Sequence, residues 1–107
     1  MTGFDMSKLM QQAAQMQEQV ERAQAELAKE TVDASAGGGM VTVRASGSGE
    51  LLEVKIAAAA IDPDDPDLLG DMILAAVNEA LRSAEKLAQS KLGASMPDLG
   101  SLGLPGL

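Results

Sequence analysis

The chain has 107 residues, enough for one small domain. It contains no cysteine, histidine, tryptophan or tyrosine, and Phe4 is its single aromatic residue. These absences exclude disulfides, thiolate or imidazole metal ligands, and catalysis by cysteine or histidine. The formal net charge is -8, from 8 basic and 16 acidic residues. Such an acidic balance argues against non-specific binding to nucleic acid.

The apolar residues predict a thin core. They make up 46 % of the chain, but many are alanine. A chain of this size buries only about 60–65 % of its surface on folding, so we expect further burial through oligomerisation. The longest apolar stretch, 56–61, is far below the ~20 residues needed to cross a membrane. With no targeting segment visible and no cysteine, we expect a cytoplasmic protein without a membrane partner.

Residues 5–29 predict one long helix. Apolar side chains recur in alternating steps of three and four residues, at Met6, Leu9, Ala13, Met16, Val20, Ala23 and Leu27. This is an apolar seam over three heptads, uninterrupted by glycine or proline. Asp5 or Ser7 can cap the helix. Two alanines weaken the seam as a coiled coil, so packing on another helix of the fold is favoured.

The middle of the chain predicts three short strands, at 31–34, 40–45 and 51–56, with glycine turns at 37–39 and 47–49. In the third strand Leu52, Val54 and Ile56 alternate with charged residues. We therefore expect an antiparallel meander with one buried face. The fold class predicted is α+β: a helix, a three-stranded antiparallel meander and a second helix.

The second helix is predicted from Pro66 to about residue 92, with Asp65 as N-cap and Gly93 as the C-cap residue. Its inner stripe is Leu69, Ile73, Ala76, Ala80, Ala84 and Leu87. Residues 94–107, rich in glycine, leucine and proline, are predicted to be a disordered tail whose leucines can dock on a partner. The domain is thus expected over 1–93.

The acidic turn at 62–71 and the two glycine turns each invite a ligand. The acidic turn fails the EF-hand pattern, because proline and aspartate stand at the fifth and sixth positions, so helix capping is favoured over calcium. No Lys-Ser/Thr pair follows the glycines, which favours plain hairpin turns over a phosphate loop. No Gly-x-Ser-x-Gly motif is present. We expect no enzyme activity, no cofactor, no metal and no small-molecule substrate.

The basic residues suggest a surface for phosphate. Lys8, Arg22 and Lys29 share one heptad position with Gln15, so a stripe without acids follows the first helix. On the second helix Arg82 and Lys86 lie one turn apart. The alternative is an ordinary solvated face, with Glu18 pairing to Arg22 and Glu79 or Glu85 pairing to Arg82.

Several segments together resemble the YbaB/EbfC family of bacterial nucleoid-associated proteins. They are KLMQQAAQMQE at 8–18, GMVTV at 39–43, Gly49 leading to VKI at 54–56, LGDMI at 69–73 and AVNEA at 76–80, followed by the tail. The resemblance covers about residues 5–93.

This resemblance implies a cytoplasmic, nucleoid-associated homodimer shaped like tweezers, which binds double-stranded DNA through its helical arms. It also implies that the start of the first helix lies near the end of the second, with Lys8 near Lys86 and Lys91. The candidate phosphate contacts are Lys8, Lys86 and Lys91, then Arg22, Lys29 and Arg82. The alternative is a dimeric module of the same fold that binds another protein and not DNA.

Overall fold

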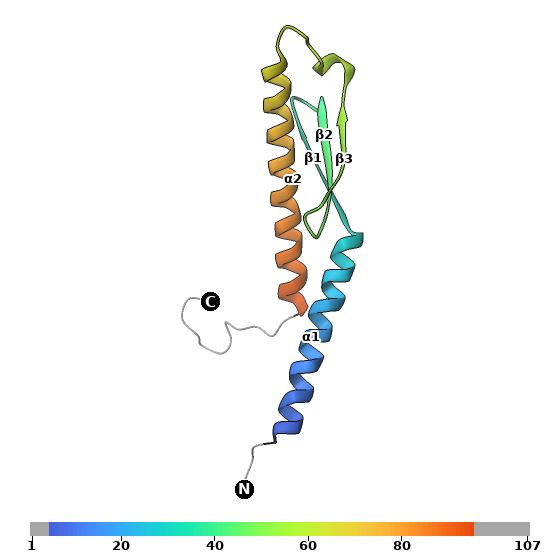
Figure 1. The fold of residues 1–107 in the computed structure, drawn as a ribbon, viewed down its shortest axis with the longest axis vertical. Helices are drawn as coiled ribbons and strands as arrows, with labels where there is room; N and C mark the ends of the chain where they lie inside the picture. Colours follow the sequence, from blue (N-terminus) through green and yellow to red (C-terminus); the bar gives the residue numbers. More distant parts are fainter. Residues whose placement is uncertain (1–4, 96–107) are drawn as a thin grey trace, which may run out of the picture.

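The computed structural model describes residues 5–95. The elements are α1 (Met6–Lys29), β1 (Thr31–Ala36), β2 (Val41–Ser46), β3 (Leu51–Ile56), a short 3-10 helix η1 (Ala58–Ala60) and α2 (Pro66–Ser95) (Figure 1). The strands form one antiparallel sheet in the order β1-β2-β3. This confirms the predicted α+β class and the order of its elements.

Helix α1 is capped as its sequence predicts but is covered along only part of its length. The Asp5 side chain accepts a hydrogen bond from the backbone N–H of Lys8 at 3.3 Å. At the other end the N–H of Glu30 donates to carbonyls of the last turn. Of the apolar seam only Ala23 and Leu27 are buried. The first three turns therefore project beyond the rest of the fold (Figure 1).

The sheet has one apolar face and one polar face. Val41 and Val43 of β2 are fully buried and pair with Ala36 and Ala34 of β1. The residues that alternate with these point to the opposite, polar face, where Arg44 donates a hydrogen bond to Asp33 at 2.9 Å. The β1–β2 turn is built from three glycines at 37–39, all with positive φ, a conformation that costs other residues energy.

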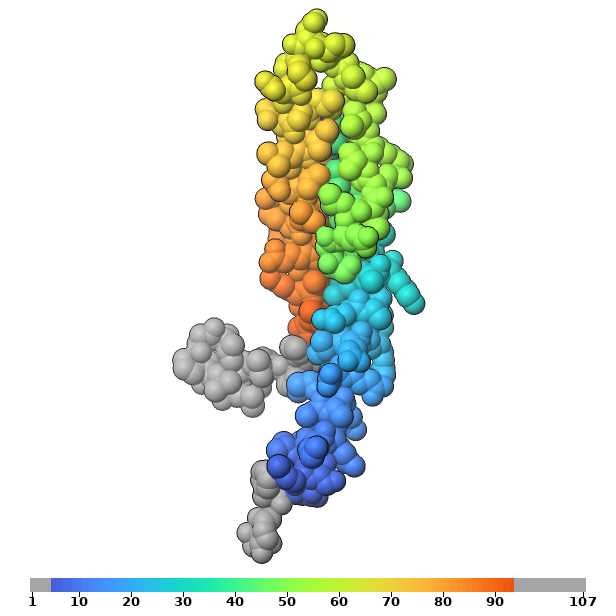
Figure 2. All heavy atoms as spheres, in the orientation of Figure 1, coloured from blue at the N-terminus to red at the C-terminus, as the bar shows by residue number. Residues whose placement is uncertain are grey.

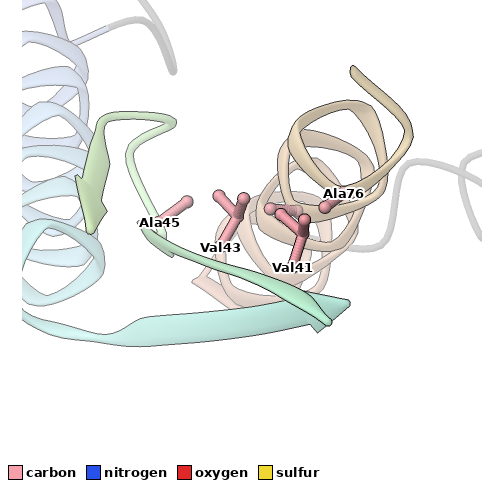
Figure 3. Close-up of a cluster of buried hydrophobic side chains, with 5 residues drawn as sticks. Val41, Val43, Ala45 and Ala76 are labelled. Carbon is pink, nitrogen blue, oxygen red and sulfur yellow. The ribbon is translucent and has the colours of Figure 1, made fainter. Parts of the chain in front are cut away.

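Helix α2 covers the apolar face of β1 and β2. Ala76, Ala80 and Ala84 of its inner stripe are buried, and the side chains of Val41 and Val43 point at this helix (Figure 3). Because the stripe is alanine, the helix axis can approach the sheet closely. The predicted inner stripe is confirmed.

Strand β3 is not covered, and here the prediction of a fully buried face is wrong for the single chain. Val54 pairs with Val43, and Ile56 pairs with Val41, so both share the apolar face of β2. Nevertheless Val54 is 43 % exposed and Ile56 38 % exposed. One helix of about 10 Å diameter spans two strands spaced about 4.8 Å apart, not three.

Helix α2 begins as predicted and ends later than predicted. The Asp65 carboxylate accepts from the N–H of Leu68 at 3.3 Å, and Pro66 is the first helical residue. Gly93 is not a C-cap residue, because the helix passes through it and ends at Ser95. Nothing forces a stop there, since a glycine inside a helix costs only about 1 kcal/mol relative to alanine. The predicted tail, from residue 96 onward, lies outside the described residues.

The two helices run in opposite directions, and the end of α2 packs beside the second half of α1. The molecule is elongated, with extents of 78 × 28 × 16 Å. Where α1, α2 and the β2–β3 turn meet, the surface has a mostly apolar hollow of about 330 Å³. Its lining is Gln24, Leu27, Gly47, Ser48, Ala88 and Leu92.

Candidate nucleic-acid interface

The stripe at Lys8, Gln15, Arg22 and Lys29 lies along one side of α1, because α1 is an uninterrupted helix. At 1.5 Å per residue, Lys8 and Lys29 are about 32 Å apart along the axis. A heptad position drifts by about 20° per repeat, so the stripe winds gently around the helix. It presents separated point charges to solvent and forms no pocket.

The two arginines among the candidates have acidic partners. Arg22 pairs with Glu18 at 2.9 Å, one turn earlier on α1. Arg82 donates through Nε and Nη2 to Glu79 on α2. All four side chains are more than half exposed, so these pairs are weak and can be exchanged for a phosphate.

Lys91 is held between two carboxylates of α1. Its Nζ lies 2.7 Å from Glu30 Oε1 and 3.1 Å from Glu26 Oε2, and its side chain is only 25 % exposed. The hydrogen bonds that its ammonium group donates to Glu30 and then to Glu26 raise the pKa of Lys91 above the usual lysine value. This lysine joins the two helices, so a phosphate would have to displace two carboxylates to reach it.

Three lysines have no ion-pair partner within the described part of the chain: Lys8, Lys29 and Lys86. Lys29 is in the last turn of α1. Lys86 lies about 7.5 Å before Lys91 along α2 and about 140° around the helix axis from it. Lys29 is thus at the C-terminal end of α1 and Lys8 at its N-terminal end.

The structure therefore contradicts the expected proximity of Lys8 to Lys86 and Lys91. Lys91 contacts Glu26 and Glu30, and Glu26 lies about 27 Å from Lys8 along α1. The reason is that the first turns of α2 are used to cover the sheet. Only its last turns reach α1, and they meet the second half of that helix.

The first half of α1 has an unusual charge distribution for an acidic chain. Residues 6–17 include Lys8 and no acidic residue, and the first turn contains no acid. Glutamines are frequent there and are exposed, at positions 11, 12, 15 and 17. Amide side chains and the positive end of a helix dipole both favour phosphate oxygens. The projecting first half of α1 is thus the part of this helix that is best suited to bind an anion.

Two further cations, which the sequence analysis did not single out, lie on the polar face of the sheet. Arg44 bonds Asp33 at 2.9 Å, and this contact lowers the pKa of the Asp33 carboxyl and raises that of the Arg44 guanidinium. Lys55 lies 3.4 Å from Glu53. The partner of Arg44 is visible only from strand register, since Arg44 stands between Asp33 and Glu53 across the sheet, whereas Glu53 and Lys55 lie two residues apart on β3.

The acids of the turn before α2 have local structural roles. Asp62 Oδ1 accepts from the N–H of Asp64 at 2.9 Å, and Asp65 caps α2. Among the described residues no group of three or more acidic side chains is arranged to hold a metal ion. The glycine turns connect adjacent antiparallel strands, as predicted.

Comparison with known proteins decides the family. The model of the YbaB/EbfC DNA-binding family matches residues 1–99. The chain belongs to this family. The resemblance inferred from the motifs is thereby confirmed, and the chain is a member of a DNA-binding, nucleoid-associated family.

Curated relatives match over nearly their whole lengths. A nucleoid-associated protein of Saccharopolyspora erythraea is 50 % identical, with 96 % of this chain and 94 % of that protein covered. A nucleoid-associated protein of Acetivibrio thermocellus is 47 % identical, with 98 % and 91 % covered.

A solved structure supports the fold. The uncharacterized protein HP0035 from Helicobacter pylori superimposes with a TM-score of 0.73 at 22 % identity, covering 82 % of this chain and 92 % of that one. At this identity the likeness concerns the fold alone. No helix in the described range is long and apolar enough to span a membrane.

Proposed function

We propose that this YbaB/EbfC-family protein binds double-stranded DNA as a homodimer and acts at the nucleoid, in the cytoplasm, in DNA organisation or gene regulation. The observation that carries the DNA part is the acid-free, glutamine-rich first half of α1, which projects from the fold with Lys8 exposed. An acidic protein can bind DNA only where its acids are sparse, and here that place is the arm. No catalysed reaction is part of the proposal.

We assign the phosphate contacts first to Lys8, Lys29 and Lys86. Among the described residues these lysines have no carboxylate partner that a phosphate would have to displace. Arg22 and Arg82 are second, because each must exchange one exposed glutamate for a phosphate. Lys91 is left out, since it is bound by Glu26 and Glu30. Contacts of this kind position the protein on the backbone and read no sequence.

The homodimer is supported by an apolar surface that the single chain leaves open, the β3 patch. On β3 it comprises Leu52, Val54 and Ile56, which are all exposed. Beside them on α2, Leu74 and Leu81 are 60 % and 36 % exposed.

These two helix residues lie on the β3 side of α2, because they occupy the same heptad position as Ala88. Ala88 lines the hollow beside the β2–β3 turn. Figure 2 shows β3 at the molecular surface alongside α2. A continuous apolar patch next to an unpaired strand edge favours association, and a second copy buries the same patch on both partners.

A fluorescence-anisotropy titration with duplex DNA at several salt concentrations tests the DNA contacts. Three lysines in each of two subunits make six contacts, so log K should fall with log salt at a slope of about -5. Lys8→Gln, Lys29→Gln and Lys86→Gln should each weaken binding and reduce the slope by about 2, one contact per subunit. Lys55→Gln is the matched control, since it removes the same charge from the polar sheet face.

Absence of binding to duplex DNA at low salt and micromolar protein would sink the proposal. Equal effects of Lys55→Gln and Lys8→Gln would instead show that only the net charge matters. If no DNA binds, the chain's net charge of -8 and its exposed apolar surfaces favour a protein partner. A pull-down after nuclease treatment would then identify it.

A further inference from the structure

Glu26 lies between two of the cations on the α1 stripe. It stands four residues after Arg22 and three residues before Lys29. Both spacings bring side chains together on the surface of a helix, so the Glu26 carboxylate can pair with either cation. Such a pair would place a carboxylate where the proposed function needs a phosphate.

The structure shows Glu26 bound to a third cation, on the other helix. The end of α2 lies beside this part of α1 (Figure 1), and Nζ of Lys91 is 3.1 Å from Glu26 Oε2. Arg22 bonds Glu18 in the preceding turn at 2.9 Å, and within residues 5–95 Lys29 has no ion-pair partner. Lys91 has therefore taken the carboxylate that local spacing offers to Arg22 and Lys29.

Lys91 holds Glu26 more firmly than an exposed neighbour on α1 would. Its Nζ also lies 2.7 Å from Glu30 Oε1, so one ammonium group meets two carboxylates, and its side chain is only 25 % exposed. Partial burial reduces the screening of these charges by water and salt, whereas an exposed pair within one helix is weak. The Glu26 carboxylate is thus bound to α2 before any DNA is present.

Lys91 also balances the charge at the end of the stripe. Glu26, Lys29 and Glu30 carry two negative charges and one positive charge, and Lys91 supplies the second positive charge. Without it, a phosphate approaching Lys29 would meet a site with a net negative charge, which repels the DNA backbone. With it, the site has no net charge and the Lys29 ammonium group is unpaired within the described part of the chain.

We propose that Lys91 is a positioning residue for DNA binding, which holds Glu26 so that the Lys29 ammonium group stays available to a DNA phosphate. This inference rests on the proposed function. Lys91 itself touches no phosphate, because its ammonium group is bound by Glu26 and Glu30. The end of α2 thus controls a contact that α1 makes.

Acetylation of lysines by a limiting amount of an amine-reactive reagent, read for each residue by mass spectrometry, tests the pairing without DNA. A nearby carboxylate favours the protonated ammonium group, which does not react. In Lys91→Gln, Lys29 should be acetylated several-fold more slowly than in the wild type, while Lys8 should not change. Adding Glu26→Gln to Lys91→Gln should restore the rate at Lys29. An unchanged rate at Lys29 in Lys91→Gln would overturn the proposal.

An anisotropy titration with duplex DNA tests the consequence for binding. Lys91→Gln should weaken binding several-fold, but it should have little further effect in a chain that already carries Lys29→Gln. Glu26→Gln combined with Lys91→Gln has the net charge of the wild type and should bind as the wild type does. Asp64→Asn combined with Lys91→Gln has the same net charge but removes an acid from the turn before α2, so its binding should stay weak.

The outcomes separate this role from two simpler ones. Equal rescue by Glu26→Gln and Asp64→Asn would show that only the net charge matters, and rescue by neither would show that Lys91 acts by holding the helices together. Either result overturns the proposal, as does normal DNA binding by Lys91→Gln. If the wild type binds no duplex DNA, the proposed function fails and this inference fails with it. All measurements are made below the melting temperature of the least stable variant, as circular dichroism records it.

Discussion

The Lys91 ammonium group on α2 donates a hydrogen bond of 2.7 Å to the Glu30 carboxylate, across 61 residues of sequence. Glu30 is the residue that ends α1, and its backbone carbonyl accepts from the N–H of Gly47 in the β2–β3 turn. One residue thus connects both helices and the sheet. The junction sets the direction in which the arm leaves the body of the fold.

Replacing Lys91 by glutamine should loosen this junction. We expect a lower melting temperature and faster amide exchange in the last turns of α2, because Glu26 and Glu30 lose their shared cation. Lys86→Gln is the matched control, and it should leave both quantities unchanged. An equal loss of stability in the two variants would contradict the role assigned to Lys91.

The stabilisation by Lys91 should depend on pH in a defined direction. Its pKa is raised in the folded protein above the ordinary value of 10.5, so folding favours the protonated lysine. The advantage of the wild type over Lys91→Gln is therefore complete below that pH and disappears as pH rises through the raised pKa. Melting curves of both proteins between pH 8 and the alkaline limit of folding measure this difference.

Gly47→Ala should destabilise the fold by about 1–3 kcal/mol. A Cβ atom at residue 47 would lie 2.8 Å from the carbonyl oxygen of Leu27 and 2.9 Å from its Cδ2. The oxygen belongs to helix backbone, which cannot move away without breaking the junction. Urea unfolding at a fixed protein concentration gives the change, and an unaltered midpoint would show that the turn can shift.

Gly93→Ala should have the opposite effect and raise the free energy of unfolding. Gly93 lies inside α2, and nothing is within 4 Å of the position of its missing Cβ. Alanine there raises helix propensity and stabilises by up to about 1 kcal/mol. Had Gly93 been a left-handed C-cap residue, alanine would destabilise instead. The same urea experiment therefore tests where α2 ends.

Val54→Lys should convert the proposed dimer into a monomer. It places a charge in the centre of the β3 patch, and burying an unpaired charge between two subunits is costly. Light scattering should give a mass of about 22 kDa for the wild type and near the 11.0 kDa of the chain for the variant. Ser35→Lys, on the polar face of β1, is the control and should stay dimeric. A wild-type mass of one chain at micromolar concentration would refute the dimer.

Local structure followed from sequence because local interactions determine it. The heptad spacing from Met6 to Leu27, the alternation around Val54 and the Asp65-Pro66 start of α2 each indicated the element that the structure contains. The end of α2 was misplaced, because a glycine such as Gly93 weakens a helix without stopping it.

Sequence spacing likewise predicted some of the ion pairs and missed others. Arg22 with Glu18 and Arg82 with Glu79 are pairs within one helix, and their spacing predicts them. Lys91 has its partners on another helix, so periodicity did not exclude it from the phosphate contacts.

The sequence alone therefore determined the elements, their order and the family, because periodicity, caps and turns act over a few residues. The tertiary structure decided which apolar faces stay open and which cations are already neutralised. Both depend on where α2 lies: it covers β1 and β2 but not β3, and it reaches only the second half of α1. The width of one helix and the length of α2 that extends beyond the sheet set these limits. No local pattern in the chain encodes either.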